Sequence, residues 1–266
     1  MAMAPNPVCF KCYAPQDPLS QFVDLLWYWR GHDLSCGKER VLPSGTVEVV
    51  IKLGSRRASE AGISGPRSRF FLIERTDQDE FLGIHFKQGG AFPFFRFPIS
   101  ALHNRDGALT DVWGERRSDE LISRIHDAAT VQEKFCFLEK WLLLNANRPL
   151  QHHPAVSYAV AQFQRDPAIS SAEMANAVGF SQRKFIDLFR DEVGFGPKLL
   201  CRVLRFQQVI RTIKDRDAVD WIDVALSAGY YDQAHFIHDF QEFTGLNPGE
   251  YLPLRTEHLN HVTTRE

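Results

Sequence analysis

The sequence predicts an α+β protein in which a β-rich, barrel-like first half is followed by an all-α second half. Three observations lead to this prediction. Apolar and polar residues alternate in short runs before about residue 110, apolar residues recur every three or four positions after Ser118, and one segment of the second half is repeated fifty residues later. Short alternating runs are typical of sandwiches and small barrels, and an internal repeat indicates one supersecondary unit used twice.

The composition is that of a globular protein, with 44% hydrophobic and 24% charged residues. No apolar run approaches ~20 residues, and the N-terminus lacks the features of a secretory signal, so we expect a cytoplasmic protein without a membrane span. The five cysteines are odd in number, which fits a reducing compartment. Cys9 and Cys12 have metal-ligand spacing, but no second pair accompanies them. We therefore expect two free thiols near a loose terminus, and no metal or cofactor.

Three segments of the first half are predicted strands, at residues 42–54, 69–74 and 81–86. The first alternates behind a Pro-Ser-Gly turn, and turn residues bound the other two. His85 lies in the third strand, where we expect a hydrogen-bonded core histidine. The aromatic residues of this half either line a ligand pocket or form the core, and their strand spacing favours the core. They are Trp27, Tyr28, Trp29, Phe70, Phe71, Phe92, Phe94, Phe95 and Phe97.

The apolar period changes to that of a helix near Ser118. Residues 146–154 contain two prolines and no periodic pattern, which indicates a domain boundary. We therefore expect a β-rich sensor or dimerisation domain at residues 1–115, a helical linker region at 116–154 and a helical domain at 155–256.

The repeat lies within this helical domain. Residues 173–179, EMANAVG, align with residues 223–229, DVALSAG, and residues 185–189 align with residues 236–240. Each copy reads as a short helix, a turn that begins at glycine, and a second helix. Two copies in register report a supersecondary unit that is used twice.

The turn residues specify the unit further. Gly179 and Gly229 stand where the end of a helix needs a positive φ, and Ser181 and Asp232 follow as N-caps of the second helix. This is the helix-turn-helix design, whose second helix enters the DNA major groove. The alternative is a pair of plain αα-hairpins in an all-helical core. Two copies in register favour DNA binding.

Residues 197–213 join the two units, and Pro197 suits the first turn of a helix. A helix of this length extends roughly 25 Å. Such a connector can hold two reading helices about one DNA turn, ~34 Å, apart on one face of the duplex.

The second half resembles the DNA-binding domain of AraC/XylS-type transcriptional regulators, which carry two such motifs joined by a long helix. The matching residues are 169–197, ISSAEMANAVGFSQRKFIDLFRDEVGFGP, and 223–251, DVALSAGYYDQAHFIHDFQEFTGLNPGEY. The segments LPSGTVEVVIKLG, GIHFKQGGAFPFF and DVWG resemble the N-terminal domain of a subgroup of these regulators. The resemblance implies a transcriptional regulator that binds double-stranded DNA. It implies control by a small-molecule effector or by dimerisation through the first half, with RNA polymerase and a second copy of the chain as further partners.

The resemblance also assigns DNA-binding residues. Gln233 can pair bidentately with adenine and Arg183 with guanine, whereas an exposed isoleucine can contact a thymine methyl group. Lys184, Arg190 and Arg202 are the phosphate candidates, although a solvated charged face would explain them equally well. Ile186 and Ile237 are either base contacts or peripheral core. The complete set is Ser181, Gln182, Arg183, Lys184, Ile186, Asp187, Arg190, Gln233, Ala234, Ile237 and His238.

Two departures from the family favour another interpretation. Asp187 and His238 stand where many relatives have arginine, and residues 155–255 contain eleven basic and thirteen acidic side chains, a net charge of −2. Non-specific DNA affinity should therefore be weak. The alternative function is a helix-turn-helix module that has lost specific DNA binding and works through protein contacts. An enzyme is not expected, because neither a metal-binding cluster nor a nucleophile paired with a base is recognisable in the sequence.

Overall fold

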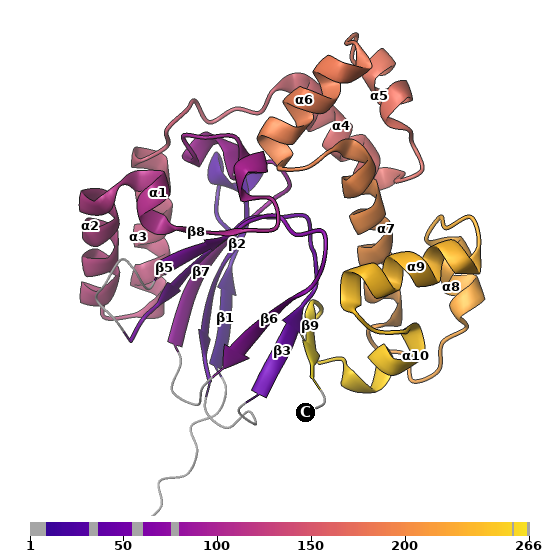
Figure 1. Ribbon diagram of the computed structural model, residues 1–266. Coiled ribbons are helices and arrows are strands. Elements are labelled where there is room, and N and C mark those ends of the chain that lie inside the picture. Colours follow the sequence, from indigo (N-terminus) through magenta and orange to yellow (C-terminus); the bar gives the residue numbers. More distant parts are fainter. Residues whose placement is uncertain (1–8, 32–36, 55–60, 76–79, 257, 265–266) are drawn as a thin grey trace, which may run out of the picture.

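The computed structural model describes residues 9–31, 37–54, 61–75, 80–256 and 258–264 (Figure 1). Nine antiparallel strands within these ranges form two sheets, of six strands in the order β1-β2-β7-β4-β5-β8 and of three in the order β6-β3-β9. The strands are β1 Cys9–Tyr13, β2 Val23–Arg30, β3 Gly37–Val41, β4 Glu48–Lys52, β5 Ala61–Ser64, β6 Phe71–Arg75, β7 Glu80–Phe86, β8 Asp106–Ala108 and β9 His261–Thr263.

The β-rich first half is confirmed, but its sheets do not close into a barrel. Strands β1 and β8 form the two edges of the larger sheet. Strand β3 pairs with β6 on one side and with β9 on the other, so neither β3 nor β6 joins the larger sheet to complete a ring. The barrel-like shape expected from strand spacing is therefore replaced by two open sheets.

The predicted segment 42–54 contains β4, and the predicted segments 69–74 and 81–86 overlap β6 and β7, each of which extends one residue further. Side chains along β4 alternate between buried and half-buried, because its two neighbours β5 and β7 hold it inside the sheet. The expected loose terminus around Cys9 and Cys12 is wrong, since these residues lie in β1 and pair with Arg30 and Trp27 of β2. Both cysteines are free thiols.

Three helices pack against the larger sheet, α1 Leu109–Trp113, α2 Glu115–Asp127 and α3 Val131–Leu144 (Figure 1). Trp113, Leu121 and Leu138 from these helices share one core with Leu26 and Ile84 of the strands. Four of the nine aromatic residues named above, Tyr28, Trp29, Phe94 and Phe95, are buried, and Phe92 and Phe97 pack partly buried against the core of the larger sheet.

Seven α-helices follow, and residues 155–254, which the structure describes throughout, contain no strand. The helices are α4 Pro154–Arg165, α5 Ser171–Ala177, α6 Gln182–Val193, α7 Pro197–Ile213, α8 Trp221–Ser227, α9 Gln233–Thr244 and α10 Pro248–Tyr251. Pro197 stands in the first turn of α7, as predicted. No helix within the described ranges is long and apolar enough to cross a bilayer.

The two halves share cores and hydrogen bonds. Leu42, which follows β3, and Val262 of β9 are buried in the same cluster as the aromatic residues of the second helix-turn-helix unit. Gln207 of α7 is buried and donates hydrogen bonds of 2.8 Å to the carbonyl of Pro43 and to Oδ1 of Asn260. The first half therefore touches the long helix that joins the two units.

The first unit contacts the β-rich half at the end of α6. Gly194 ends this helix with a φ of 103°, and a Cβ atom built there would lie 2.4 Å from Cγ of Pro66 and 2.9 Å from Cγ2 of Ile99. The backbone of the helix end therefore lies directly against the first half. Neither helix-turn-helix unit is independent of the sheets.

His85 forms a charge-assisted hydrogen bond inside the larger sheet. Its Nδ1 lies 2.6 Å from Oε1 of Glu48 on the neighbouring strand. Burial lowers the pKa of His85, but the hydrogen bond to Glu48 and the charges of Glu48 and Asp24 outweigh burial, so the pKa lies above its ordinary value. The hydrogen-bonded histidine expected from the sequence is thus present.

This pair predicts a pH-dependent stability. The pKa of His85 is raised in the folded chain, so the His85–Glu48 pair stabilises the fold fully below the pKa of about 6.5 that the histidine has in the unfolded chain. This stabilisation is lost as pH rises through the pKa of the folded state. The free energy of unfolding should therefore fall as pH rises from below about 6.5 through the raised folded pKa, and the fall should be smaller in His85→Gln. Denaturant unfolding at a series of pH values measures it. Equal slopes for the two proteins would contradict the prediction.

Candidate nucleic-acid interface

Both turns of the repeated unit have the same backbone geometry. Gly179 and Gly229 have φ angles of 74° and 81°, as predicted. The amide of Gly179 donates to the carbonyl of Asn176 at 3.1 Å, and the next amide, that of Phe180, donates to Ala175 at 3.0 Å. The second turn repeats this pattern with 3.0 Å bonds from Gly229 to Leu226 and from Tyr230 to Ala225. Each first helix thus ends in a Schellman motif.

Gly229→Val should lower the free energy of unfolding by at least about 1 kcal/mol, through left-handed strain on a β-branched residue. The nearest atom to a new Cβ is Cδ of Arg205 at 3.7 Å, so the cost is backbone strain and not a collision. Gly249→Val is the matched control, because Gly249 has no positive φ and no neighbour within 4 Å. Thermal unfolding of the two variants measures the difference. Equal melting temperatures would show that the turn tolerates a side chain.

The second helix of each unit begins at the predicted N-cap. The hydroxyl of Ser181 accepts from the amide of Lys184 at 3.3 Å, and the carboxylate of Asp232 accepts from the amide of His235 at 2.7 Å. These caps start α6 and α9 at equivalent positions after the two turns. The two second helices are therefore built alike from local sequence.

An aromatic stripe fixes which face of each second helix is buried. Phe185 and Phe189 of α6 are buried in one core, and Phe236 and Phe240 of α9 are buried in another. Leu188 is only half-buried at the edge of the first stripe. The opposite faces of α6 and α9 are consequently left for solvent or a partner.

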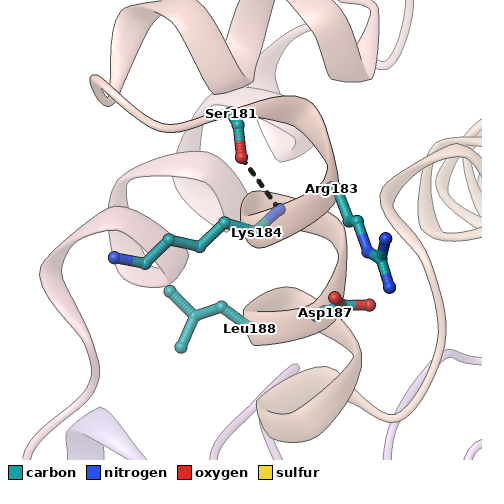
Figure 2. Close-up of a pocket in the computed structure, with 5 residues that line it drawn as sticks. All are labelled: Ser181, Arg183, Lys184, Asp187 and Leu188. Carbon is teal, nitrogen blue, oxygen red and sulfur yellow. Dashed lines mark hydrogen bonds between the residues drawn. The ribbon is translucent and has the colours of Figure 1, made fainter.

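On α6, most candidate residues lie on the exposed face. Figure 2 shows Arg183 and Asp187 on one side of the helix, with Lys184 and Leu188 on another. They border a shallow hollow of about 390 Å³. The ammonium of Lys184 lies 4.5 Å from the ring centroid of Phe180. The exposed candidates are Ser181, Gln182, Arg183, Lys184, Asp187 and Arg190.

Ile186 and Arg190 are less clearly placed to face DNA than the remaining candidates on α6. Ile186 is half-buried. Arg190 is exposed, but it lies near His103 of the first half. The pKa of His103 is lowered by the burial of its ring and, next, by the positive charge of Arg190. Phosphate contact by Arg190 therefore remains a prediction for a residue at the border between α6 and the first half.

On α9, Gln233, Ala234 and His238 are exposed. Ile237 is half-buried and packs against the core of the second unit. The exposed set lies in the first turn and a half of the helix, which is the part that contacts base edges in this class of motif.

Arg202 is not free to contact phosphate, so its assignment as a phosphate candidate is wrong. Its Nη2 donates to Oδ1 of Asp239 at 2.6 Å and also to Glu242, and its Nε donates to the same Asp239 oxygen at 3.1 Å. The guanidinium also lies 5.2 Å from the ring centroid of Phe243. Arg202 thus joins α7 to α9 and positions the second helix of the second unit.

The sequence position of Asp239 could have predicted that its carboxylate has a partner, which the structure shows to be Arg202. Asp239 lies in register with Phe236, Phe240 and Phe243, the buried stripe of α9, and it is 1% exposed. A buried carboxylate needs a cationic or hydrogen-bonding partner. A partner for Asp239 was therefore predictable, although its identity was not.

The same carboxylates form part of a candidate cation site. Within the described ranges, His238, Asp239 and Glu242 are the group whose ligand atoms lie within 4.8 Å of one another. Arg202 already bridges the two carboxylates and neutralises much of their charge. This arrangement does not favour a metal ion.

Two family models match the chain. One, described as Domain of unknown function (DUF6597), covers residues 11–107, and the other, described as Helix-turn-helix domain, covers residues 174–253. A search of curated proteins found no match.

Several solved structures are similar in arrangement. ToxT from Vibrio cholerae is 12% identical, with 93% of this chain and 98% of ToxT covered and a TM-score of 0.43. ToxT from Vibrio cholerae bound to (E)-4-(8-methylnaphthalen-1-yl)but-3-enoic acid is 10% identical, with 91% of this chain and 98% of ToxT covered and a TM-score of 0.41. The C-terminal domain of AraT, a response regulator from Geobacillus stearothermophilus, is 18% identical, with 40% of this chain and 89% of the AraT domain covered and a TM-score of 0.37. At these scores the similarity indicates nothing about ligands of this chain.

The matched segment 174–253 spans α5 to α10 almost completely and includes both glycine turns, both capped second helices and the joining helix α7. Sequence match, repeat and geometry agree, and residues 174–253 form an AraC-type helix-turn-helix domain.

Proposed function

We propose that the chain is a sequence-specific DNA-binding transcriptional regulator that places α6 and α9 in successive major-groove segments. The observation that carries this proposal is the repeated unit with an exposed face on each second helix. The 17-residue helix α7 separates the two units by a length of roughly 25 Å. That length suits two reading helices on one face of a duplex.

Base reading is proposed for Arg183 and Asp187 on α6 and for Gln233, Ala234 and His238 on α9. Gln182 and Lys184 lie beside the first pair and can contact sugar and phosphate. Gln182 also donates to Ser171 at 3.3 Å, which holds its side chain toward α5. These roles rest on exposure and on chemistry that suits base edges.

Regulation is proposed to act through the first half, by a small-molecule effector or by dimerisation. The contacts described above support it, because β9 lies against β3 and the end of α6 lies against Pro66 and Ile99. A change in the sheets would therefore reach both units. The boundary near residue 154 and a contact with RNA polymerase remain parts of this proposal.

The second candidate function is a helix-turn-helix module that contacts proteins instead of DNA. The exposed carboxylate of Asp187 beside Arg183 favours it, because a carboxylate on a reading face repels phosphates. Acids also outnumber bases in the second half.

A gel-shift experiment separates the two. The full chain is titrated onto the promoter beside its own gene and onto a shuffled duplex of equal length, at low and at physiological salt. The proposal expects a preference for the promoter that persists at physiological salt. Binding that is equal for the two duplexes and disappears at physiological salt would favour the protein-contact module. The absence of binding to either duplex would favour it too.

Gln233→Ala should weaken binding to the specific site by about 1–3 kcal/mol and leave the salt dependence almost unchanged. Lys184→Ala, if the side chain meets phosphate, should weaken binding to all duplexes alike and reduce the salt slope by about one unit. Fluorescence anisotropy at several salt concentrations measures both. Each variant is the other's control, since unfolding would damage specificity and salt slope together. Intact operator discrimination in Gln233→Ala would remove α9 from base reading.

A further inference from the structure

A groove runs between α2 and α3 on the outside of the first half, with a volume of about 730 Å³. Phe137, Trp141 and Leu144 contribute apolar surface, and Leu144 is 84% exposed. Four basic side chains against two acids give the lining a net charge of +2. The charged residues are Arg116, Arg117, Arg124, Lys140, Glu120 and Glu133.

This groove does not complement itself. A two-fold symmetric contact would place the same patch of both copies face to face, and the surplus of positive charge would be opposed by the same surplus. The groove instead fits a surface that combines exposed apolar side chains with negative charge.

The outer face of α8 has this chemistry. Ile222 and Leu226, one helical turn apart, are 55% and 58% exposed. Asp220 caps the helix, Asp223 is exposed within it, and the helix with its cap contains no lysine or arginine. α8 therefore presents an apolar pair beside two carboxylates.

The internal repeat shows that the unit does not need this apolar pair to fold. The equivalent positions on α5, fifty residues earlier, are Ala172 and Asn176, and both are exposed. The first unit thus forms with a small and a polar residue where the second unit exposes Ile222 and Leu226.

We propose that α8 of one copy docks in the α2–α3 groove of a second copy, in a head-to-tail contact. The two surfaces lie at opposite ends of the molecule, so they cannot meet within one chain (Figure 1). A contact between different patches is heterologous, and it leaves one groove and one α8 free at the two ends of an open assembly. The proposal does not depend on DNA binding. If DNA is bound as well, copies joined this way would favour sites repeated in the same direction.

Analytical ultracentrifugation of the full chain without DNA tests this contact. The wild-type chain should associate as its concentration rises to about 100 μM, and salt should weaken the association. Arg116→Glu with Lys140→Glu should lower the association constant about tenfold or more. Ile222→Ala with Leu226→Asn, which copies the outer face of α5, should do the same.

Mixing the two double variants gives the decisive result. One retains an intact α8 and the other an intact groove, so the mixture should form a one-to-one dimer and nothing larger. Arg165→Glu with Lys198→Glu reverses as many exposed charges outside both surfaces and should associate like the wild type. Circular dichroism checks folding, and an acid at position 116 suits the first turn of α2. A monomeric wild type, a saturating wild-type dimer, or a monomeric mixture would each overturn the proposal.

Discussion

Arg202→Met should lower the free energy of unfolding by about 3–5 kcal/mol, the cost of leaving a buried charge without its partner. The carboxylate of Asp239 is only 2% exposed, and Arg202 donates two hydrogen bonds to one of its oxygens. The other oxygen, Oδ2, has no hydrogen-bond partner among the described residues. Methionine keeps much of the apolar stem but removes all donors. Denaturant unfolding measures the loss.

Two further variants decide whether the lost pairing is the cause. Arg211→Met makes the same change at an exposed position of α7 and should stay within about 0.5 kcal/mol of the wild type. Arg202→Met combined with Asp239→Leu removes both charges and should recover most of the loss. A double variant as unstable as Arg202→Met would show that the arginine stem, and not the ion pair, stabilises this junction.

Val262→Asp should cost about 3 kcal/mol or more, because it removes a buried valine and places a carboxylate in an apolar core. Val262 is 0% exposed and belongs to the core of the second unit, together with Leu42 from the first half. The carboxylate can escape only if β9 leaves β3. We therefore expect the two halves to unfold less cooperatively, which calorimetry would show as a broadened or divided transition.

The neighbouring residue Thr263 provides the control. It lies on the same strand with its side chain exposed, and its hydroxyl donates to the carbonyl of Leu254 at 3.1 Å. Thr263→Asp should cost no more than about 1 kcal/mol, the value of one hydrogen bond. Similar losses in both variants would mean that added charge, and not burial, weakens the strand.

The second half was predictable because its signals are local. Each turn needs one glycine with positive φ, each second helix needs one cap, and each buried face needs aromatic residues three or four positions apart. Gly229, Asp232 and Phe236 supply all three within eight residues. The exposed candidates on α6 and α9 follow from the same register, since fixing the buried stripe also fixes the outward face.

The features that escaped prediction depend on distant partners. A strand of three residues, β9, has no periodicity to detect, and only its pairing with β3 makes it a strand. Barrel closure is likewise decided by which strands pair, and alternation within one strand does not report it. The assignment of Arg202 to phosphate was wrong for the same reason, because its partner Asp239 lies on another helix.

The pairing of β3 with β9 also sets an order of events during synthesis. Val41 and His261 are partners although 220 positions separate them. While the ribosome makes the intervening chain, β3 can pair with β6 on one side, but its other edge stays open. An open edge can recruit strands from other chains, which makes nascent proteins prone to aggregate. The small sheet can therefore be completed only after both helix-turn-helix units have been made.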